Sequence, residues 1–136
     1  MRTLVAAVVA AVVVVVVGFG VVTLTALEGK EVVVLETTDA AGAARRTRTW
    51  VADENGSAWI EAANPERDFL ADLRRTPRLV LERRGARHDC TAEVAPNPEG
   101  HDHIRRLLAA RYGWADCWIA LLADTHASLA IRLACA

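Results

Sequence analysis

The stretch RRTRTWV at residues 45–51 carries the side chains best suited to binding chemistry. Because side chains alternate between the two faces of a strand, Arg46, Arg48 and Trp50 would share one face. Guanidinium groups bind phosphates and carboxylates through paired hydrogen bonds, and an indole offers a flat surface to a planar ring. This face therefore suits a phosphorylated planar cofactor. The alternative is an exposed strand face on which an arginine pairs with Glu61 across a hairpin, and the spacing alone does not decide between them.

The three cysteines, Cys90, Cys117 and Cys135, are odd in number, and none belongs to a C-x-x-C pair. This pattern favours small buried apolar residues over metal ligands or a catalytic thiol. A disulfide is the alternative if the domain is exported from the cytoplasm.

Histidines and carboxylates give no catalytic pattern. His101 and His103 flank Asp102, but positions two residues apart on a helix point about 200° away from each other, so we expect no metal site. The sequence has no G-x-S-x-G motif, P-loop or G-x-G-x-x-G motif, and its carboxylates stand singly, which gives no support to a hydrolase. The net charge of -1 over 136 residues gives no reason to expect nucleic-acid binding.

Leu4 to Leu27 form an uncharged run of 24 residues. As a helix, at about 1.5 Å per residue, the run reaches roughly 36 Å, enough to cross a hydrocarbon core of about 30 Å with some tilt. A secretory signal peptide is the alternative, but its apolar region is typically about 7–15 residues long and Leu24-Thr25-Ala26 is a poor cleavage site. The sequence therefore predicts a single-pass transmembrane anchor over residues 1–28 and one domain over residues 29–136. Positive charge is nearly equal on the two flanks, so the positive-inside rule does not orient the anchor.

The rest of the chain predicts short strands and few helices. Strands are expected at residues 31–38, 46–53, 58–63, 79–83, 87–94 and 128–133. An Asn-Gly turn at residues 55–56 would join the second and third strands in a hairpin, and helices would begin at Asn64-Pro65-Glu66 and Asn97-Pro98-Glu99. Gly113 would end the later helix before a further helical piece over 114–123. These elements indicate a mainly β member of the α+β class, a small closed or partly closed antiparallel barrel with helices packed outside.

From Val32 to Leu133 the chain resembles the deazaflavin-dependent nitroreductase family, within the split β-barrel flavin-binding superfamily. The resemblance covers about three quarters of the chain and rests on the order of loose motifs: the strand end Thr37-Thr38, then RRTRTWV, NPERDFLADLRRTP, VLERRGARHDCTAEV, ARYGWAD and AIRL. It implies a small antiparallel split β-barrel with flanking helices. Such barrels bind a deazaflavin coenzyme, or FMN in related families, and members transfer a hydride from the reduced deazaflavin to quinones or nitro compounds.

Carried over residue by residue, the resemblance implies a cofactor site formed by the second strand and by the loop and helix start after the third strand. The implied cofactor-binding residues are Arg46, Arg48, Thr49, Trp50, Asn64 and Arg67, and Tyr112 is the candidate for the substrate border. The chain departs from the family in the loop before the second strand, where members carry T-x-G-R-K-S-G. Here residues 38–44 read TDAAGAA, so either Arg45 and Arg46 replace the missing basic pair or the cofactor has been changed or lost.

The sequence thus predicts a membrane-tethered oxidoreductase that moves a hydride from reduced deazaflavin, or flavin, to a quinone or nitro-type acceptor. Residues 4–27 would contact the lipid bilayer, in which quinones dissolve. The alternative is a non-catalytic split-barrel ligand-binding or assembly module at the membrane that has lost the cofactor. The superfamily resemblance adds a homodimer as an expected assembly. It also slightly favours the cytoplasmic side for the domain, because deazaflavin coenzymes are made in the cytoplasm.

Overall fold

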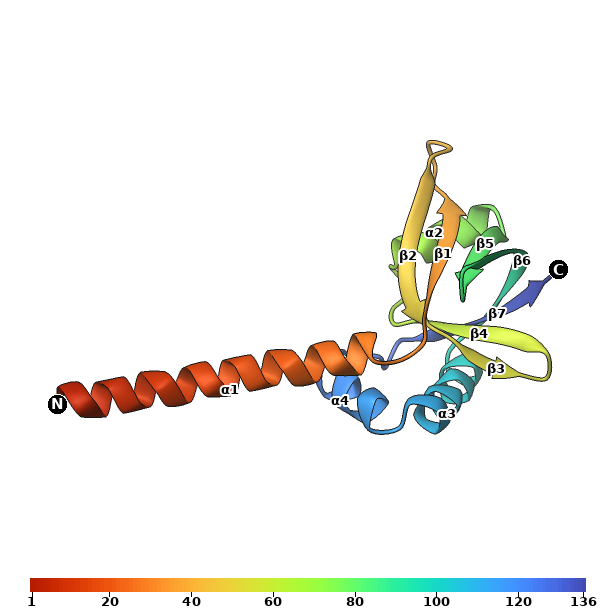
Figure 1. Ribbon diagram of the computed structural model, residues 1–136. Coiled ribbons are helices and arrows are strands. Elements are labelled where there is room, and N and C mark those ends of the chain that lie inside the picture. The colour runs from red at the N-terminus through yellow and green to blue at the C-terminus, as the bar shows by residue number, and fades with distance from the viewer.

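A long N-terminal helix projects from a curled β-sheet in the computed structural model, which describes all 136 residues (Figure 1). The elements are α1 (Arg2–Glu28), β1 (Val32–Thr38), β2 (Ala44–Trp50), β3 (Ala52–Glu54), β4 (Ser57–Ala62), α2 (Asp68–Arg75), β5 (Arg78–Arg83), β6 (Ala86–Ala95), α3 (Glu99–Tyr112), α4 (Trp114–Leu122) and β7 (Leu129–Cys135).

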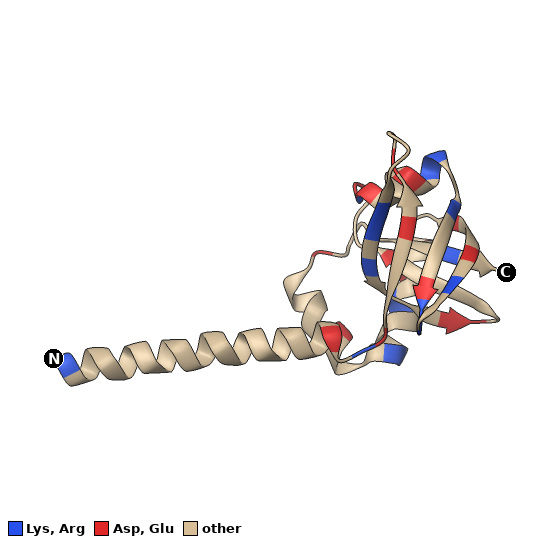
Figure 2. Cartoon of the chain, turned by 45° about the horizontal axis from the view of Figure 1, so that its top comes forward, with Lys and Arg blue, Asp and Glu red and all other residues tan.

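Helix α1 matches the uncharged run that the sequence predicts. It is 27 residues long, and Ala26 is its only buried residue. Figure 2 shows no charged residue along the helix between its two ends. One helix of the chain, α1, is therefore long and apolar enough to cross a membrane. Valine is a mediocre helix former in water, but in lipid every backbone group must bond internally, which favours a helix.

The seven strands form one antiparallel sheet in the order β2-β1-β5-β6-β7-β4-β3. The sheet curls into a half-barrel whose edge strands are β2 and β3, and β2 contacts β4 across the opening (Figure 1). The predicted fold class, a small antiparallel split barrel with flanking helices, is confirmed. The opening between β2 and β4 is the part of the barrel that hydrogen-bonded strands leave unclosed.

The core fills the concave side of the sheet because buried and more exposed side chains alternate along the strands. In β1, for example, Val33 and Leu35 are fully buried. Helix α2 covers this core with Phe69, Leu70 and Leu73. Each such large side chain stabilises the fold by roughly 1.5–3 kcal/mol when it leaves water. A smaller second cluster packs α3 against the sheet and contains Ala52, Ile104, Leu108, Tyr112 and Ala130.

Two predicted elements are wrong in detail. The second strand ends at Trp50 and pairs with β1, while only the short β3 forms the Asn-Gly hairpin with β4. Glu61 therefore does not face Arg46 across a hairpin; it pairs with Arg105 of α3 instead. The first domain helix begins at Asp68 rather than at Asn64, because the Asn64 Oδ1 accepts a hydrogen bond from the Glu66 N–H at 3.0 Å and closes a turn.

The cysteines differ from the favoured sequence interpretation. Cys90 of β6 and Cys135 of β7 are opposite each other in the sheet and form a disulfide, which was the alternative. Cys117 is free and exposed on α4. The disulfide could not be inferred from spacing, because 45 residues separate the two cysteines and only the β6–β7 pairing brings them together.

We expect the disulfide to stabilise the domain mainly by constraining the unfolded chain. Closing a loop across 45 residues corresponds to about 3–4 kcal/mol in the chain-entropy account. The double variant Cys90→Ser/Cys135→Ser should lose that much in the free energy of unfolding, measured by denaturant titration of the full chain in detergent. Cys117→Ser is the matched control and should leave the value unchanged. Equal stability of the double variant and the wild type would contradict the prediction.

Candidate functional site

The opening of the barrel contains two adjoining cavities. The inner cavity, about 380 Å³, lies between β2, the end of β4, the last turn of α1 and helices α3 and α4. Its walls are mainly apolar, with a few polar groups; the lining residues are Leu27, Glu28, Val32, Arg48, Thr49, Trp50, Glu61, Ala63, Arg67, Leu108 and Ile119.

The outer cavity, about 500 Å³, lies between β2 and the segment that leads into α2. Three of its lining residues are arginines, two are acidic and Phe69 is the only hydrophobic one; the set is Arg45, Arg46, Thr47, Asn64, Glu66, Arg67, Asp68 and Phe69. Arg67 lines both cavities, so the two form a cleft with an apolar inner part and a charged outer part. All six residues that the sequence assigned to the cofactor line this cleft.

Arg46 is the first of these residues, and carboxylates already surround it. It donates to Glu36 of β1 at 3.3 Å and to Glu82 of β5 at 3.0 and 2.6 Å. Arg87 pairs with the same two glutamates from the other side. The hydrogen bonds from Arg46 lower the pKa of Glu82, so both partners stay charged. Arg46 therefore lines the outer cavity and also forms ion pairs on the outer surface of the sheet.

Arg48 and Trp50 hydrogen-bond β2 to the C-terminal end of α1. Arg48 donates to Glu28, the last residue of α1, at 2.6 Å, and the Trp50 Nε1 donates to the Leu27 carbonyl oxygen at 3.4 Å. The Trp50 ring is stacked on Tyr112, with 4.6 Å between ring centroids and 14° between planes. One face of the indole is thus covered by Tyr112.

Tyr112 is buried, with 2% of its surface exposed, and it does not line the cleft. Its hydroxyl accepts a hydrogen bond from the Val51 N–H at 3.1 Å and lies 2.7 Å from the Val51 carbonyl oxygen and 2.9 Å from that of Glu31. Burial raises the pKa of Tyr112. Its position behind Trp50 differs from the substrate border that the sequence suggested, and its contacts are those of a residue that positions Trp50.

Asn64 and Arg67 differ in whether another group already holds the side chain. The Oδ1 of Asn64 is occupied by the turn at Glu66, whereas Arg67 has no carboxylate within ion-pair distance. The Arg67 guanidinium lies 5.8 Å from the centroid of the Phe69 ring. Among the three predicted arginines, Arg46 and Arg48 form ion pairs and Arg67 does not, although Glu66 and Asp68 line the same cavity.

Arg45 points the other way from Arg46 and supports α2. It donates to buried Asp72 at 2.8 Å, and Thr37 donates to the same carboxylate at 2.8 Å. Burial by itself would raise the pKa of Asp72, but the hydrogen bonds from Thr37, Arg45 and Arg75 outweigh it and lower the pKa. Arg45 therefore has a structural role in holding α2, and its replacement of the missing basic loop stays a prediction. That loop is held by Asp39, whose Oδ1 accepts from the N–H groups of Ala41 and Ala43.

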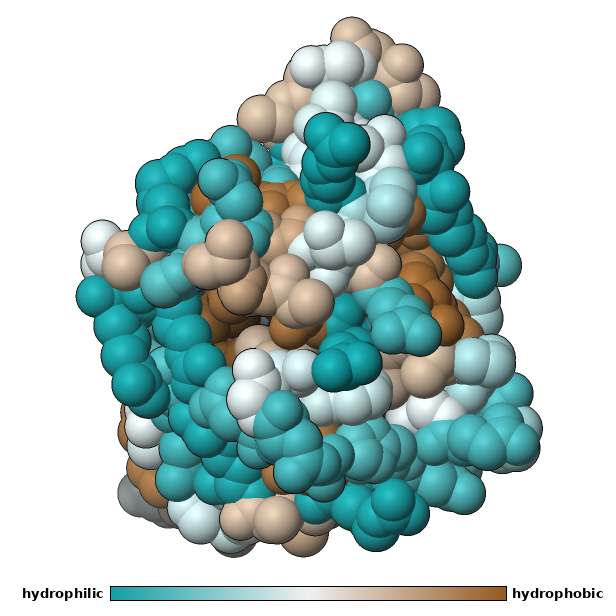
Figure 3. Space-filling view, turned by 90° about the vertical axis from the view of Figure 1, so that its right-hand side faces the viewer, coloured by the Kyte–Doolittle hydropathy of each residue, from teal (hydrophilic) through white to brown (hydrophobic).

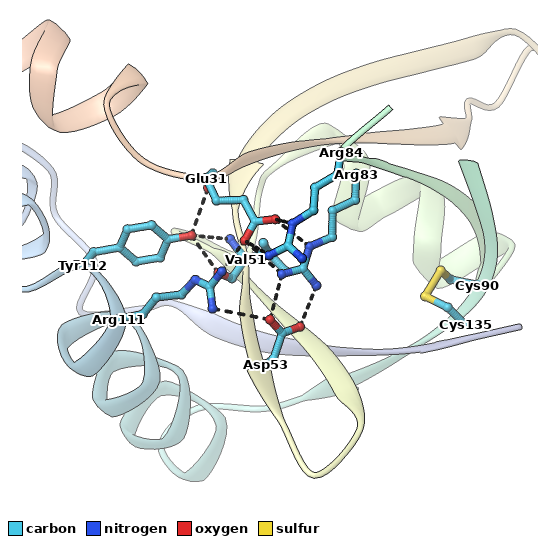
Figure 4. Close-up of polar contacts among 9 residues, drawn as sticks. All are labelled: Glu31, Val51, Asp53, Arg83, Arg84, Cys90, Arg111, Tyr112 and Cys135. Carbon is cyan, nitrogen blue, oxygen red and sulfur yellow. Dashed lines mark hydrogen bonds and ion pairs between the residues drawn. A yellow bond between two sulfur atoms is a disulfide. The ribbon is translucent and has the colours of Figure 1, made fainter. Parts of the chain in front are cut away.

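A group of five charged residues, missed by the sequence analysis, fixes the junction between α1 and the barrel (Figure 4). Glu31 accepts hydrogen bonds from Arg83, Arg84 and Arg111, and Asp53 accepts from Arg83 and Arg111. The hydrogen bonds from Arg83, the largest influence, lower the pKa of Glu31 from 4.5 to about 2 despite partial burial. The five side chains come from the α1–β1 junction, β3, β5, the β5–β6 turn and α3, so spacing in the sequence could not reveal them.

Glu61 is a further residue that the sequence analysis did not assign to the site. It lines the inner cavity, and its Oε2 accepts from Arg105 at 3.2 Å. Its other carboxylate oxygen, Oε1, is buried and has no hydrogen-bond partner. A buried acceptor without a partner is costly, and this oxygen is also shielded from the cavity, since it has almost no accessible surface.

The histidines do not share a centre. His101 Nδ1 lies 2.7 Å from the Ser128 hydroxyl, whereas the His103 ring packs edge-on against Trp59 with centroids 4.4 Å apart. Their separate partners agree with the opposite directions expected on a helix.

Comparison with solved structures identifies the fold. An F420-H2 dependent reductase superposes with a TM-score of 0.55 at 20% identity, covering 74% of this chain and 92% of the other. A pyridoxamine 5'-phosphate oxidase-like protein of Listeria innocua gives a TM-score of 0.57 at 12% identity, with 82% and 89% covered. A chain described as a domain-swapped dimer gives 0.58 at 17% identity, with 76% and 79% covered.

No family model and no curated protein matches the sequence. At these identities the structural likeness establishes the fold alone, an antiparallel half-barrel shared with the F420-H2 dependent reductase and the pyridoxamine 5'-phosphate oxidase-like protein. The predicted resemblance is confirmed at that level.

The Glu31 group predicts a specific dependence of stability on pH. Because the pKa of Glu31 is lower in the folded state, its contribution is present above its ordinary pKa of 4.5 and is lost as the pH falls toward about 2. We expect Glu31→Gln to lower the melting temperature by several degrees at pH 7 and by progressively less below pH 4.5. Thermal unfolding between pH 7 and pH 3, followed by circular dichroism, measures this.

Glu99→Gln is the matched control, since Glu99 is exposed and has no arginine partner. Its effect should be small at every pH. A Glu31→Gln effect that is the same at pH 7 and pH 3 would show that the arginines do not hold Glu31 ionised.

Proposed function

We propose that this split β-barrel is a membrane-tethered oxidoreductase that uses a reduced deazaflavin, or FMN, to reduce a quinone or nitro-type acceptor. The observation that carries the proposal is the two-part cleft, apolar inside and charged outside, on a fold shared with an F420-H2 dependent reductase. F420 is a deazaflavin coenzyme, which combines a planar ring with a phosphorylated tail.

The residues present fit such a cofactor. The inner cavity offers mainly apolar walls for a ring. The outer cavity offers Arg67 as a cation outside any ion pair for a phosphate, with Arg45 and Arg46 beside it. Guanidinium groups bind phosphate oxygens bidentately, which would fix the tail.

When bound, the cofactor would supply the hydride, and the protein would supply position and environment. Trp50 is held rigidly by its stack on Tyr112, so it would form a fixed wall for the ring. Thr49, on the other face of β2, would offer a hydroxyl to the same cavity. The apolar inner cavity would limit the access of water to the reacting face.

The acceptor is proposed from the position of the inner cavity. Leu27 and Glu28, the last residues of α1, form part of its wall. If α1 crosses the bilayer, the cavity lies at the membrane surface, where a quinone dissolved in the lipid would reach it. Membrane tethering itself is part of the proposal and rests on the length and apolar composition of α1.

The alternative function, a non-catalytic ligand-binding or assembly module, is favoured by a different observation. Arg46 and Arg48 are each paired with glutamate, and the loop at residues 38–44 has no cation. A barrel with these features could keep its fold after losing a phosphorylated cofactor. Dimerisation stays a proposal for either function, supported by the domain-swapped dimer among the similar structures.

The disulfide bears on the side of the membrane. The resemblance favours the cytoplasm, where deazaflavin coenzymes are made, whereas disulfides persist mainly in oxidising compartments. The deazaflavin-dependent function thus predicts a cytoplasmic domain, whereas the non-catalytic alternative is compatible with an exported domain.

Cofactor binding by the full chain in nanodiscs tests the main proposal. We expect reduced F420 or FMN to bind, and Arg67→Ala to weaken binding about 10-fold or more, because it removes a charge-assisted contact to phosphate. Arg106→Ala is the matched control: it removes one exposed arginine of α3 outside both cavities and should change affinity less than about 2-fold. Absence of binding of either cofactor at high micromolar concentration would contradict the proposal.

The oxidation state of the cysteines in intact cells tests the membrane side. If the domain is cytoplasmic, Cys90 and Cys135 should be reduced and become alkylated when cells are quenched in acid and treated with a maleimide. If it is exported, only Cys117 should react before reduction. The second pattern would contradict the cytoplasmic, deazaflavin-dependent function.

A further inference from the structure

Helix α4 is the one part of the domain with a large apolar exposed surface. Outside α1, the exposed large hydrophobic side chains of the chain are Trp114, Leu121 and Leu122, and all three are on α4. Leu121 is 80% exposed. By contrast, the face of the molecule that points away from α1 is mainly hydrophilic (Figure 3). The large exposed hydrophobic side chains of the domain therefore lie on one element, α4, which contacts α1.

The exposed residues of α4 form a stripe along the helix. At 100° per residue, Trp114, Cys117, Trp118 and Leu121 point in similar directions, with Leu122 beside them. The single charged residue of α4, Asp116, points the opposite way: it is buried and accepts two hydrogen bonds from Arg105 of α3 at 2.7 and 2.6 Å. The outward stripe thus carries no charge.

Helix α4 is fixed against the last turns of α1 (Figure 1). The Trp118 ring contacts Phe19 with centroids 5.5 Å apart, and its Nε1 donates to the Thr23 hydroxyl at 3.0 Å. Phe19 and Thr23 are four residues apart, so they share a face of α1. This contact and the Arg105–Asp116 pair hold α4 in place between the barrel and the long helix.

The contact sets the depth of α4. Phe19 precedes Glu28, the last residue of α1, by nine positions, which is about 14 Å along the helix axis. The apolar run exceeds a 30 Å hydrocarbon core by roughly 6 Å, so even with all the excess on the domain side Phe19 lies within the lipid region. A helix that touches Phe19 from the side is then inside the same leaflet.

We infer that α4 is a second membrane-embedded element, inserted beside α1 with Trp114, Cys117 and Leu121 facing lipid and Trp118 packed on α1. This inference rests on the membrane tether of the proposed function. The bilayer is favoured over a second copy because the stripe continues the exposed apolar surface of α1, including Leu24 and Leu27. Ile119 of α4 and Leu27 of α1 both line the inner cavity, so both helices form part of its wall.

Site-directed spin labelling of the full chain in phosphatidylcholine–phosphatidylglycerol vesicles tests the inference. A nitroxide at Leu121→Cys, in a Cys117→Ser background, is compared with labels at Val12→Cys in the middle of α1 and Ala41→Cys in the exposed β1–β2 loop. Collision with oxygen reports lipid, and collision with a water-soluble nickel chelate reports water. We expect the oxygen-to-nickel ratio at position 121 to approach that at position 12 and to exceed that at position 41 several-fold.

Three other results would each overturn the inference, and they differ from one another. Lipid exposure at position 12 with water exposure at position 121 would place α4 in water and leave the tether intact. Protection from both reagents at position 121, with spin–spin broadening, would show that a second copy covers α4. Water exposure at position 12 would remove the tether itself. Labelling the native Cys117 without substitution repeats the measurement if Leu121→Cys fails to fold. No outcome depends on cofactor binding, so a failure of the oxidoreductase proposal is distinguishable.

Discussion

The hydroxyl group of Tyr112 links three parts of the chain: α3, which carries it, the break between β2 and β3, and the segment before β1. It bonds the backbone of Val51, where β2 ends and β3 begins, and it also contacts the carbonyl of Glu31 at the start of the barrel. A buried peptide group left without a partner costs about 1–3 kcal/mol, so the break at Val51 depends on that hydroxyl. The break lets β2 pair with β1 while β3 pairs with β4, and the opening between β2 and β4 contains the cleft.

The same junction joins the barrel to α1. Glu31 lies three residues after the end of α1 and is surrounded by arginines from β5, the β5–β6 turn and α3. Exposed ion pairs are individually weak, but a group with shared carboxylates and partial burial fixes geometry more strongly. With Arg48–Glu28 and Trp118–Phe19, it gives the long helix a defined direction relative to the cleft. That direction is what the proposed route from lipid to the inner cavity requires.

Most arginines near the cleft are committed to structure. Arg45 pairs with Asp72, Arg46 with Glu36 and Glu82, and Arg48 with Glu28. A phosphate would compete with carboxylates at these positions, whereas at Arg67 it would meet a guanidinium outside any ion pair. The balance of charge therefore moves the proposed anion contact from β2 toward the segment before α2, away from the loop at residues 38–44, which has no cation.

The residues expected at the opening came from the family resemblance, whereas the sequence by itself determined the long apolar helix and the strands of the antiparallel barrel. These follow from local signals: an uncharged run, alternation along strands, and turn residues at Asn55-Gly56 and Gly113. Only the tertiary structure decided which side chains pair in ion pairs, in the disulfide and in the ring stack. Arg46 meets Glu36 and Glu82 rather than Glu61, Cys90 meets Cys135, and Tyr112 lies behind Trp50, because strand order and the break at Val51 depend on packing between distant segments. Such contacts leave no periodic trace in the chain, since charge pairing and stacking depend on distance in space and not on spacing in sequence.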